Sequence, residues 1–417
     1  MSRSFHVKLA AFACAATVLW CQGPAFGRVK LTTLPERQRV EIQLDNGAAT
    51  LVEEERIVTL LEGTNFIDFS WSNTAIDKST IQFRVVEMPL RDKKGGDSPT
   101  MVRPDGKVEM IRVINVAFPP GENALTWEVY GEKPFAARVR ISYLIANLTR
   151  SFNYRAAAEN DESRLTLWNY IRLDNLSGEE FGTSGIWAGF GNYFQKMVGL
   201  NEAKQMLAWK FEGVPIKKTF TFDWWRGQPV PNEPFQRYVA MRYVLTNDKE
   251  HGMGLFPLQP GKVRIFQKDG HGGEAFIGED WGKFTAIDDE MKLYLGLARD
   301  IEVTRKLAKN VRQITNLTVY DQDVVLEYTI KNFKKTAVTL DVAEDIQRLR
   351  DELCGQKQHD PEWQIAADGT NLAATAIERK DTRTMELHVD LPAAAASGDA
   401  AVSAKTVTVH LRLKNEW

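Results

Sequence analysis

Apolar and polar residues alternate along short runs through most of the chain, starting at Val40, Ile42 and Leu44. The side chains of a β-strand point alternately to its two faces, so this pattern predicts a strand with one buried face. Residues 45–47 read Asp-Asn-Gly, which tolerate positive φ and predict a hairpin turn. Comparable runs predict strands at residues 57–61, 66–71, 81–86, 108–116, 123–130, 137–146, 165–174, 220–225, 238–245, 262–267, 274–278, 291–295, 311–319, 324–332, 338–345, 377–379, 384–391 and 406–413.

The expected fold class is mainly β, with two or three sandwich-like antiparallel β domains and a short helical segment in the middle third. Short strands separated by turn residues favour a sandwich or barrel over alternating strands and helices. The helical segment is expected between Gly191 and Phe211, where apolar residues recur at irregular spacings of three and four.

The length of the chain, 417 residues, exceeds the roughly 250–300 residues that one hydrophobic core usually serves. The predicted divisions are a signal peptide (1–27), an N-terminal β domain (28–135), a central β domain with a short helix (136–259) and a C-terminal β-sandwich domain (260–417).

The first residues have the pattern of a secretory leader. Arg3 and Lys8 precede an uncharged apolar run over residues 9–20, and Ala25 and Gly27 fit the small-residue pattern before a cleavage site. The apolar run is shorter than the ~20 residues that span a bilayer, and no later stretch is long enough. The sequence therefore predicts a periplasmic or extracellular protein with a cleavable signal peptide and no transmembrane span in the mature chain.

Cys21 offers an alternative, a lipid-modified cysteine that anchors the protein to a membrane. Its bulky neighbour Trp20 fits the small-residue pattern of such sites poorly, so the cleaved leader is favoured. Cys14 and Cys21 both fall in the leader, which leaves Cys354 without an internal disulfide partner. We expect Cys354 to be a buried, inert thiol.

Charge argues against nucleic acid as a partner. The chain has 53 Lys and Arg residues against 55 Asp and Glu residues, interspersed along its length, so it offers no basic surface to a polyanion. The partner expected is an unknown envelope protein or a glycan.

One aromatic group is the candidate ligand site. Trp224, Trp225, Arg226 and Tyr238 flank the proline-rich loop at residues 228–234. Exposed aromatic rings can stack on sugars or anchor an interface. The alternative is that these rings fill the sandwich core, where most aromatic side chains lie.

Motifs of catalysis and of metal binding are lacking. The sequence has no G-x-S-x-G elbow, P-loop or dinucleotide fingerprint. Five residues could supply ligands for calcium or zinc, namely Asp269, His271, Glu274, Glu279 and Asp280. Their spacing and the glycines among them favour a hairpin turn instead. Glu179 and Glu180 are adjacent and point to opposite faces, so they cannot form a glycosidase pair. We expect no cofactor, no metal and no catalytic residue, although clefts between domains leave an enzyme possible.

Seven blocks of the sequence share the strand and turn patterns of one known family, at residues 139–144, 153–156, 173–181, 260–266, 276–280, 303–306 and 328–332. They resemble the domain of unknown function 4139 family, whose better-known relatives are named mucoidy inhibitor A. The resemblance spans the chain from residue 136 to the C-terminus, and this chain lacks the coiled-coil insert of many relatives. The resemblance implies a β-sandwich-like exported protein of unassigned biochemistry, with no agreed catalytic residues.

These observations together predict a non-catalytic binding or structural protein of the envelope or extracellular space. The alternative is a carbohydrate-binding module or a carbohydrate-active enzyme that acts on glycans there.

Overall fold

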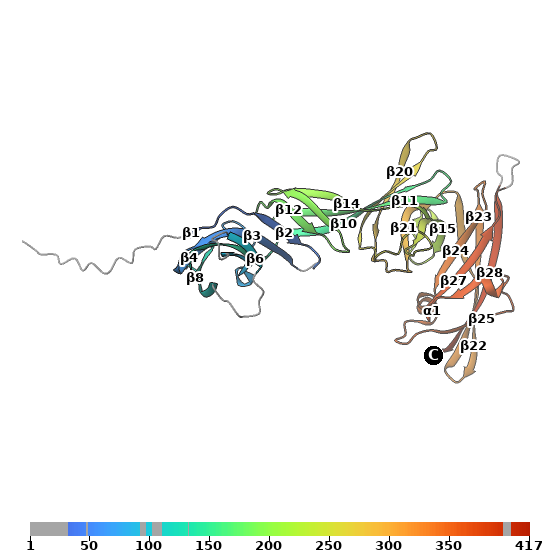
Figure 1. The fold of residues 1–417 in the computed structure, drawn as a ribbon. Coiled ribbons are helices and arrows are strands. Elements are labelled where there is room, and N and C mark those ends of the chain that lie inside the picture. Colours follow the sequence, from blue (N-terminus) through green and yellow to red (C-terminus); the bar gives the residue numbers. More distant parts are fainter. Residues whose placement is uncertain (1–31, 47–48, 92–96, 102–110, 132, 395–401) are drawn as a thin grey trace, which may run out of the picture. The chain divides into compact units, whose positions relative to one another are not determined.

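The computed structural model describes residues 32–46, 49–91, 97–101, 111–131, 133–394 and 402–417 (Figure 1). The predicted leader and Cys21 lie outside these ranges. The described residues form a mainly β protein with one α-helix, as the sequence predicts. The chain divides into two compact units, the first made of residues up to Asn147 with Ser177–Ile186 and Gln195–Leu200, and the second made of the remainder.

The first unit holds a four-stranded sheet in the order β1-β4-β8-β7 and a seven-stranded sheet in the order β13-β12-β2-β3-β9-β5-β6. Aromatic rings join the two sheets face to face: the Phe83 and Trp127 ring centroids are 5.0 Å apart, and those of Phe69 and Tyr143 are 5.9 Å apart. The strands are β1 (Thr32–Thr33), β2 (Arg39–Gln43), β3 (Thr50–Leu60), β4 (Gly63–Ser70), β5 (Gln82–Arg91), β6 (Asp97–Met101), β7 (Ile111–Ala117), β8 (Ala124–Gly131), β9 (Phe135–Ile145), β12 (Gly182–Trp187) and β13 (Tyr193–Val198).

The second unit holds three sheets, in the orders β14-β11-β10-β19-β20, β21-β18-β15-β24-β27-β26 and β16-β17-β22-β23-β28-β25. Most neighbouring strands are antiparallel, but β10 pairs with β19 and β15 with β24 in parallel. The strands are β10 (Leu148–Ala158), β11 (Arg164–Asn175), β14 (Ala203–Pro215), β15 (Lys217–Asp223), β16 (Pro229–Val230), β17 (Glu233–Arg237), β18 (Val239–Thr246), β19 (Gly261–Lys268), β20 (Glu274–Gly282), β21 (Glu290–Ala298), β22 (Ile301–Asn316), β23 (Val319–Asn332), β24 (Val338–Asp345), β25 (Glu362–Ala366), β26 (Ile377–Arg379), β27 (Thr384–Leu391) and β28 (Ser403–Glu416).

The sheet β21-β18-β15-β24-β27-β26 of the second unit contributes to two hydrophobic cores. Tyr243 of β18 packs in one core with Val263 of the five-stranded sheet. Leu340 of β24 packs in the other core with Leu326 of β23. Because alternate side chains of a strand point to opposite faces, the remaining positions of β24 and β27 lie on the polar face of this sheet.

The helix predicted between Gly191 and Phe211 is wrong, because these residues form β13 and β14. A β-bulge explains the misleading spacing. Asn169 pairs with Trp209 while its neighbour Tyr170 pairs with Leu207, so β14 carries one extra residue. The extra residue shifts the alternation of apolar positions in β14 and produces the helix-like interval of three between Met206 and Trp209.

The α-helix lies instead in the last third, at α1 (Ile346–Cys354). Asp345 caps it by accepting a hydrogen bond from the backbone N–H of Arg348 at 3.1 Å, and Gly355 ends it at φ 85°. Ile346 and Leu349 bury the inner side of the helix.

The units differ in extent from the predicted domains. The boundary predicted between residues 135 and 136 falls inside β9, whereas the first unit continues to Asn147. The boundary predicted at residues 259–260 falls inside the second unit, between β18 and β19.

Candidate functional site

A polar groove of about 560 Å³ lies on the exposed face of sheet β21-β18-β15-β24-β27-β26. Strands β24 and β27 are interior strands of this sheet, and Asp341 of β24 pairs directly with His388 of β27. Glu386 precedes His388 by two residues and therefore shares its face. The alternation of both strands thus brings three titratable side chains together on one surface.

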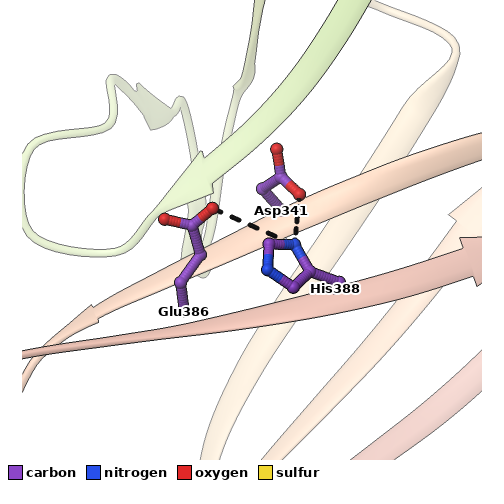
Figure 2. A group of neighbouring side chains, drawn as sticks. All are labelled: Asp341, Glu386 and His388. Atoms are coloured by element: carbon purple, nitrogen blue, oxygen red, sulfur yellow. Dashed lines mark hydrogen bonds and ion pairs between the residues drawn. The ribbon is translucent and has the colours of Figure 1, made fainter. Parts of the chain in front are cut away.

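Figure 2 shows Asp341 and Glu386 directed toward the imidazole of His388. Asp341 Oδ1 lies 2.8 Å from His388 Nδ1, and Glu386 Oε1 lies 4.0 Å from the same nitrogen. Glu378 of β26 completes the group, with its Oε2 3.4 Å from His388 Nε2. All three residues drawn are half-buried. Surrounding protein groups therefore restrain their side chains, and the cluster is still open to the groove.

The charges of this cluster influence one another. The hydrogen bond with Asp341 raises the pKa of His388, and Glu378 acts in the same direction. Lys380 donates to Glu378 at 2.7 Å and, by that hydrogen bond, lowers the pKa of the Glu378 carboxyl. The arrangement can hold a cationic imidazole or, with Nδ1 free, a metal cation.

A second candidate surface is the outer side of the five-stranded sheet. Five rings lie on it, and we call it the aromatic face: Trp168 and Tyr170 of β11, Phe266 of β19, and Phe276 and Trp281 of β20. Strand register places the rings on one side, because Lys262 pairs with Trp281, Phe266 pairs with Phe276, and Arg155 pairs with both Trp168 and Arg264. Phe276 and Trp281 are 59% and 61% exposed. Strand β20 is one of the two edge strands of the sheet (Figure 1).

Cations lie among these rings. The Arg155 guanidinium carbon is 4.6 Å from the ring centroids of both Trp168 and Phe266, and Lys210 Nζ is 5.7 Å from that of Trp168. Arg155 forms an ion pair with Glu274, and Lys210 with Glu212.

Two further cations of the aromatic face share one acid. Glu279 binds Lys262 at 2.7 Å and Arg264 at 3.2 Å, and the hydrogen bond from Lys262 lowers the pKa of Glu279. These four cations contact three acids, so the aromatic face combines exposed rings with hydrogen-bonding groups and one positive charge in excess among these residues.

The tryptophans predicted to bind ligand lie against the core of the second unit. Trp224 and Trp225 are partly buried and pack on the core that includes Leu326. Trp225 Nε1 donates to Glu344 Oε1 at 2.9 Å. Two cations lie close to the ring of Trp224, whose centroid is 4.9 Å from the guanidinium carbon of Arg305 and 4.2 Å from that of Arg237.

The other two predicted residues lie at the edges of this group. Arg226 is exposed, 3.4 Å from Asp345, and the guanidinium carbon of Arg299 is 5.7 Å from the ring of Tyr238. The contacts of all four residues are with protein groups, and a ligand role for them stays a prediction.

The segment that begins at Asp269 forms a hairpin turn between β19 and β20, as the spacing of its glycines predicts. Asp269 Oδ1 accepts hydrogen bonds from the backbone N–H groups of His271 at 2.8 Å and Gly273 at 2.9 Å. The acids that follow, Glu274 and Glu279, are engaged by the cations of the aromatic face.

The cluster around His388 is not among the sites predicted from the sequence. One signal was present, because Glu386 and His388 alternate within a predicted strand and must share a face. Asp341 lies 47 residues away, and its position opposite His388 depends on strand pairing that the sequence pattern does not reveal.

In the part of the chain that the structure describes, no helix is long and apolar enough to cross a membrane. No protein-family model matches the chain, and no curated protein matches its sequence. The resemblance to the domain of unknown function 4139 family therefore stays a prediction.

Proposed function

We propose that this protein is an exported, non-catalytic binding protein that recognises neutral glycan chains of the cell envelope or extracellular space. The observation that carries the proposal is the aromatic face, where Phe276 and Trp281 expose rings beside paired ions. The leader pattern at residues 1–27 supports export.

Sugar rings match this surface chemically. A pyranose has an apolar C–H face and a rim of hydroxyl groups, so stacking on Trp281 or Phe276 buries apolar area while the hydroxyls stay free to bond. Lys262, Arg264 and Glu279 place donors and acceptors on the same face. A neutral chain is favoured over a polyanion because both cations are already engaged by Glu279, which leaves one positive charge in excess.

The same acids argue against hydrolysis. A glycosidase needs a carboxylic acid with a raised pKa opposite a second carboxyl group. Lys262 lowers the pKa of Glu279, and Glu274 is bound to Arg155. Both carboxylates are therefore suited to orient ligand hydroxyls, and the lowered pKa of Glu279 makes it a poor proton donor.

The test is a pull-down of purified protein on insoluble neutral polysaccharides, namely cellulose, chitin and xylan. Wild type should be retained by at least one of them, and the Phe276→Ala and Trp281→Ala variants should each bind about 10–100-fold more weakly. This range corresponds to losing about 1.5–3 kcal/mol of ring burial.

Phe235→Ala is the matched control, because Phe235 of β17 is 56% exposed and lies away from the aromatic face. Retention unchanged in both ring variants, or absent for wild type on all three polysaccharides, would exclude the proposal.

A further inference from the structure

We propose that Asp341, Glu386 and His388 form a binding site for a divalent transition-metal cation, of which Zn²⁺ is the probe. This site lies on a different sheet from the aromatic face and does not depend on glycan binding. One imidazole nitrogen and two carboxylate oxygens lie within 4.8 Å of one another. Zinc is bound by these ligand types.

The distances suit a cation at the centre of the group. Ligands at about 2.0–2.2 Å from zinc in tetrahedral geometry lie about 3.3 Å from one another. Asp341 Oδ1 and Glu386 Oε1 lie 2.8 Å and 4.0 Å from His388 Nδ1, one shorter and one longer than this value. Small rotations of flexible carboxylate side chains bring both atoms to the required separation.

The backbone beneath the ligands is held rigidly. On the opposite face of the sheet, Leu340, Val342 and Leu387 alternate with the ligands and are fully buried. The strands that carry the ligands are interior strands with hydrogen-bonded neighbours on both sides. Three ligands fixed in this way leave further coordination positions open to the groove, as in metal sites that bind a water or a substrate.

Glu378 supplies the outer contact that metal-binding histidines commonly have. Its Oε2 lies 3.4 Å from His388 Nε2, and Lys380 holds this carboxylate at 2.7 Å. A proton kept on Nε2 by Glu378 leaves the lone pair of Nδ1 directed at the proposed cation. The group therefore contains both the ligands and the residue that orients the imidazole.

The competing interpretation is an ion pair of protonated His388 with Asp341 that binds no metal. The chain contains such a pair for comparison, because His251 Nδ1 lies 2.7 Å from Asp248 Oδ1. His251 is also half-exposed, and among the described residues Asp248 is its one carboxylate partner. Metal affinity should distinguish the two histidines. The single carboxylate and imidazole at His251 make a weaker metal site than the three ligands around His388.

The experiment is isothermal titration of the full chain with ZnCl₂, beside MgCl₂. We expect one Zn²⁺ bound at the cluster, no detectable binding there in H388Q, and binding at least 10-fold weaker in D341N and in E386Q. Loss of the outer contact in E378Q should weaken binding about 10-fold. H251Q should bind as wild type does, and Mg²⁺ should bind much more weakly because it disfavours imidazole ligands.

Circular dichroism keeps the result interpretable, because replacing the half-exposed His388 should leave the β spectrum and the melting temperature close to those of wild type. Wild type that binds no Zn²⁺, or H388Q that binds it as tightly as wild type, would overturn the proposal. Equal losses in H388Q and H251Q would do the same, because they would assign the affinity to histidine–carboxylate pairs in general.

Discussion

Replacing Glu344 with alanine should destabilise the second unit by about 3–5 kcal/mol, the usual cost of removing one partner from a buried ion pair. Glu344 is fully buried and accepts four hydrogen bonds. Arg305 donates two of them, at 2.7 and 2.9 Å, Tyr328 donates one at 2.7 Å and Trp225 Nε1 one at 2.9 Å. The substitution would leave the guanidinium of Arg305, which is 6% exposed, without its counter-charge.

The assay is urea unfolding of the full chain followed by tryptophan fluorescence. A chain of two units need not unfold in one step. The L326A variant marks the relevant transition, because Leu326 lies in the core on which Trp224 and Trp225 pack. The transition that L326A shifts is the one in which E344A is compared with wild type. The control is E302Q, since Glu302 and Lys331 form an exposed pair at 3.3 Å that should contribute at most about 1 kcal/mol. A loss below about 1 kcal/mol in E344A would refute the view that these tryptophans belong to a buried polar network.

Two further predictions concern groups near the C-terminus. Glu416 is fully buried, neither carboxylate oxygen has a hydrogen-bond partner among the described residues, and burial raises its pKa. Folding then favours the protonated acid and stability falls as pH rises through the ordinary glutamate range, so E416M should stabilise the protein by about 1–3 kcal/mol at pH 7. The gain should shrink toward pH 4, and a gain independent of pH in thermal melts would contradict this assignment. Burial likewise raises the pKa of the half-buried Cys354 thiol, so in a colorimetric thiol assay at pH 8 it should react more slowly than free cysteine; an equal rate would contradict this reading.

Regular strands were predictable from alternation alone. The run expected at residues 406–413 lies within β28, where Val407, Val409 and Leu411 are buried as their period of two predicts. Alternation fails where the backbone departs from regular geometry, and the extra residue near Leu207 in β14 made a strand look helical.

The candidate sites were harder to predict because they depend on which strands become neighbours. His388 belongs to a candidate site only because Asp341 lies opposite it on the adjacent strand. The aromatic face combines Trp168 and Trp281, which lie on strands far apart in the sequence. The local aromatic cluster at Trp224 and Trp225 was visible in the sequence. Its burial against Glu344 depends on a strand more than a hundred residues later.

The expectation of an exported β-rich protein without catalytic residues came from the leader pattern, the alternation of apolar positions and the lack of catalytic motifs. The resemblance to the domain of unknown function 4139 family implies the same and stays a prediction. The aromatic face of the second unit adds a specific candidate binding surface to that expectation. Five aromatic rings beside paired ions on one face of a sheet support the hypothesis of a ligand-binding surface, and this hypothesis does not depend on similarity to another protein.

The central claim, that the aromatic face binds glycan, is tested most directly by oxidative labelling of tryptophans. Full-length protein would be treated with N-bromosuccinimide, with and without the polysaccharide that retains it, and oxidation measured at each tryptophan by mass spectrometry. Trp281 is 61% exposed and Trp417, which lies on no part of the aromatic face, is 57% exposed, so both should be oxidised in the free protein. We predict that polysaccharide protects Trp281 and leaves Trp417 oxidised; equal oxidation of Trp281 with and without ligand would contradict the account.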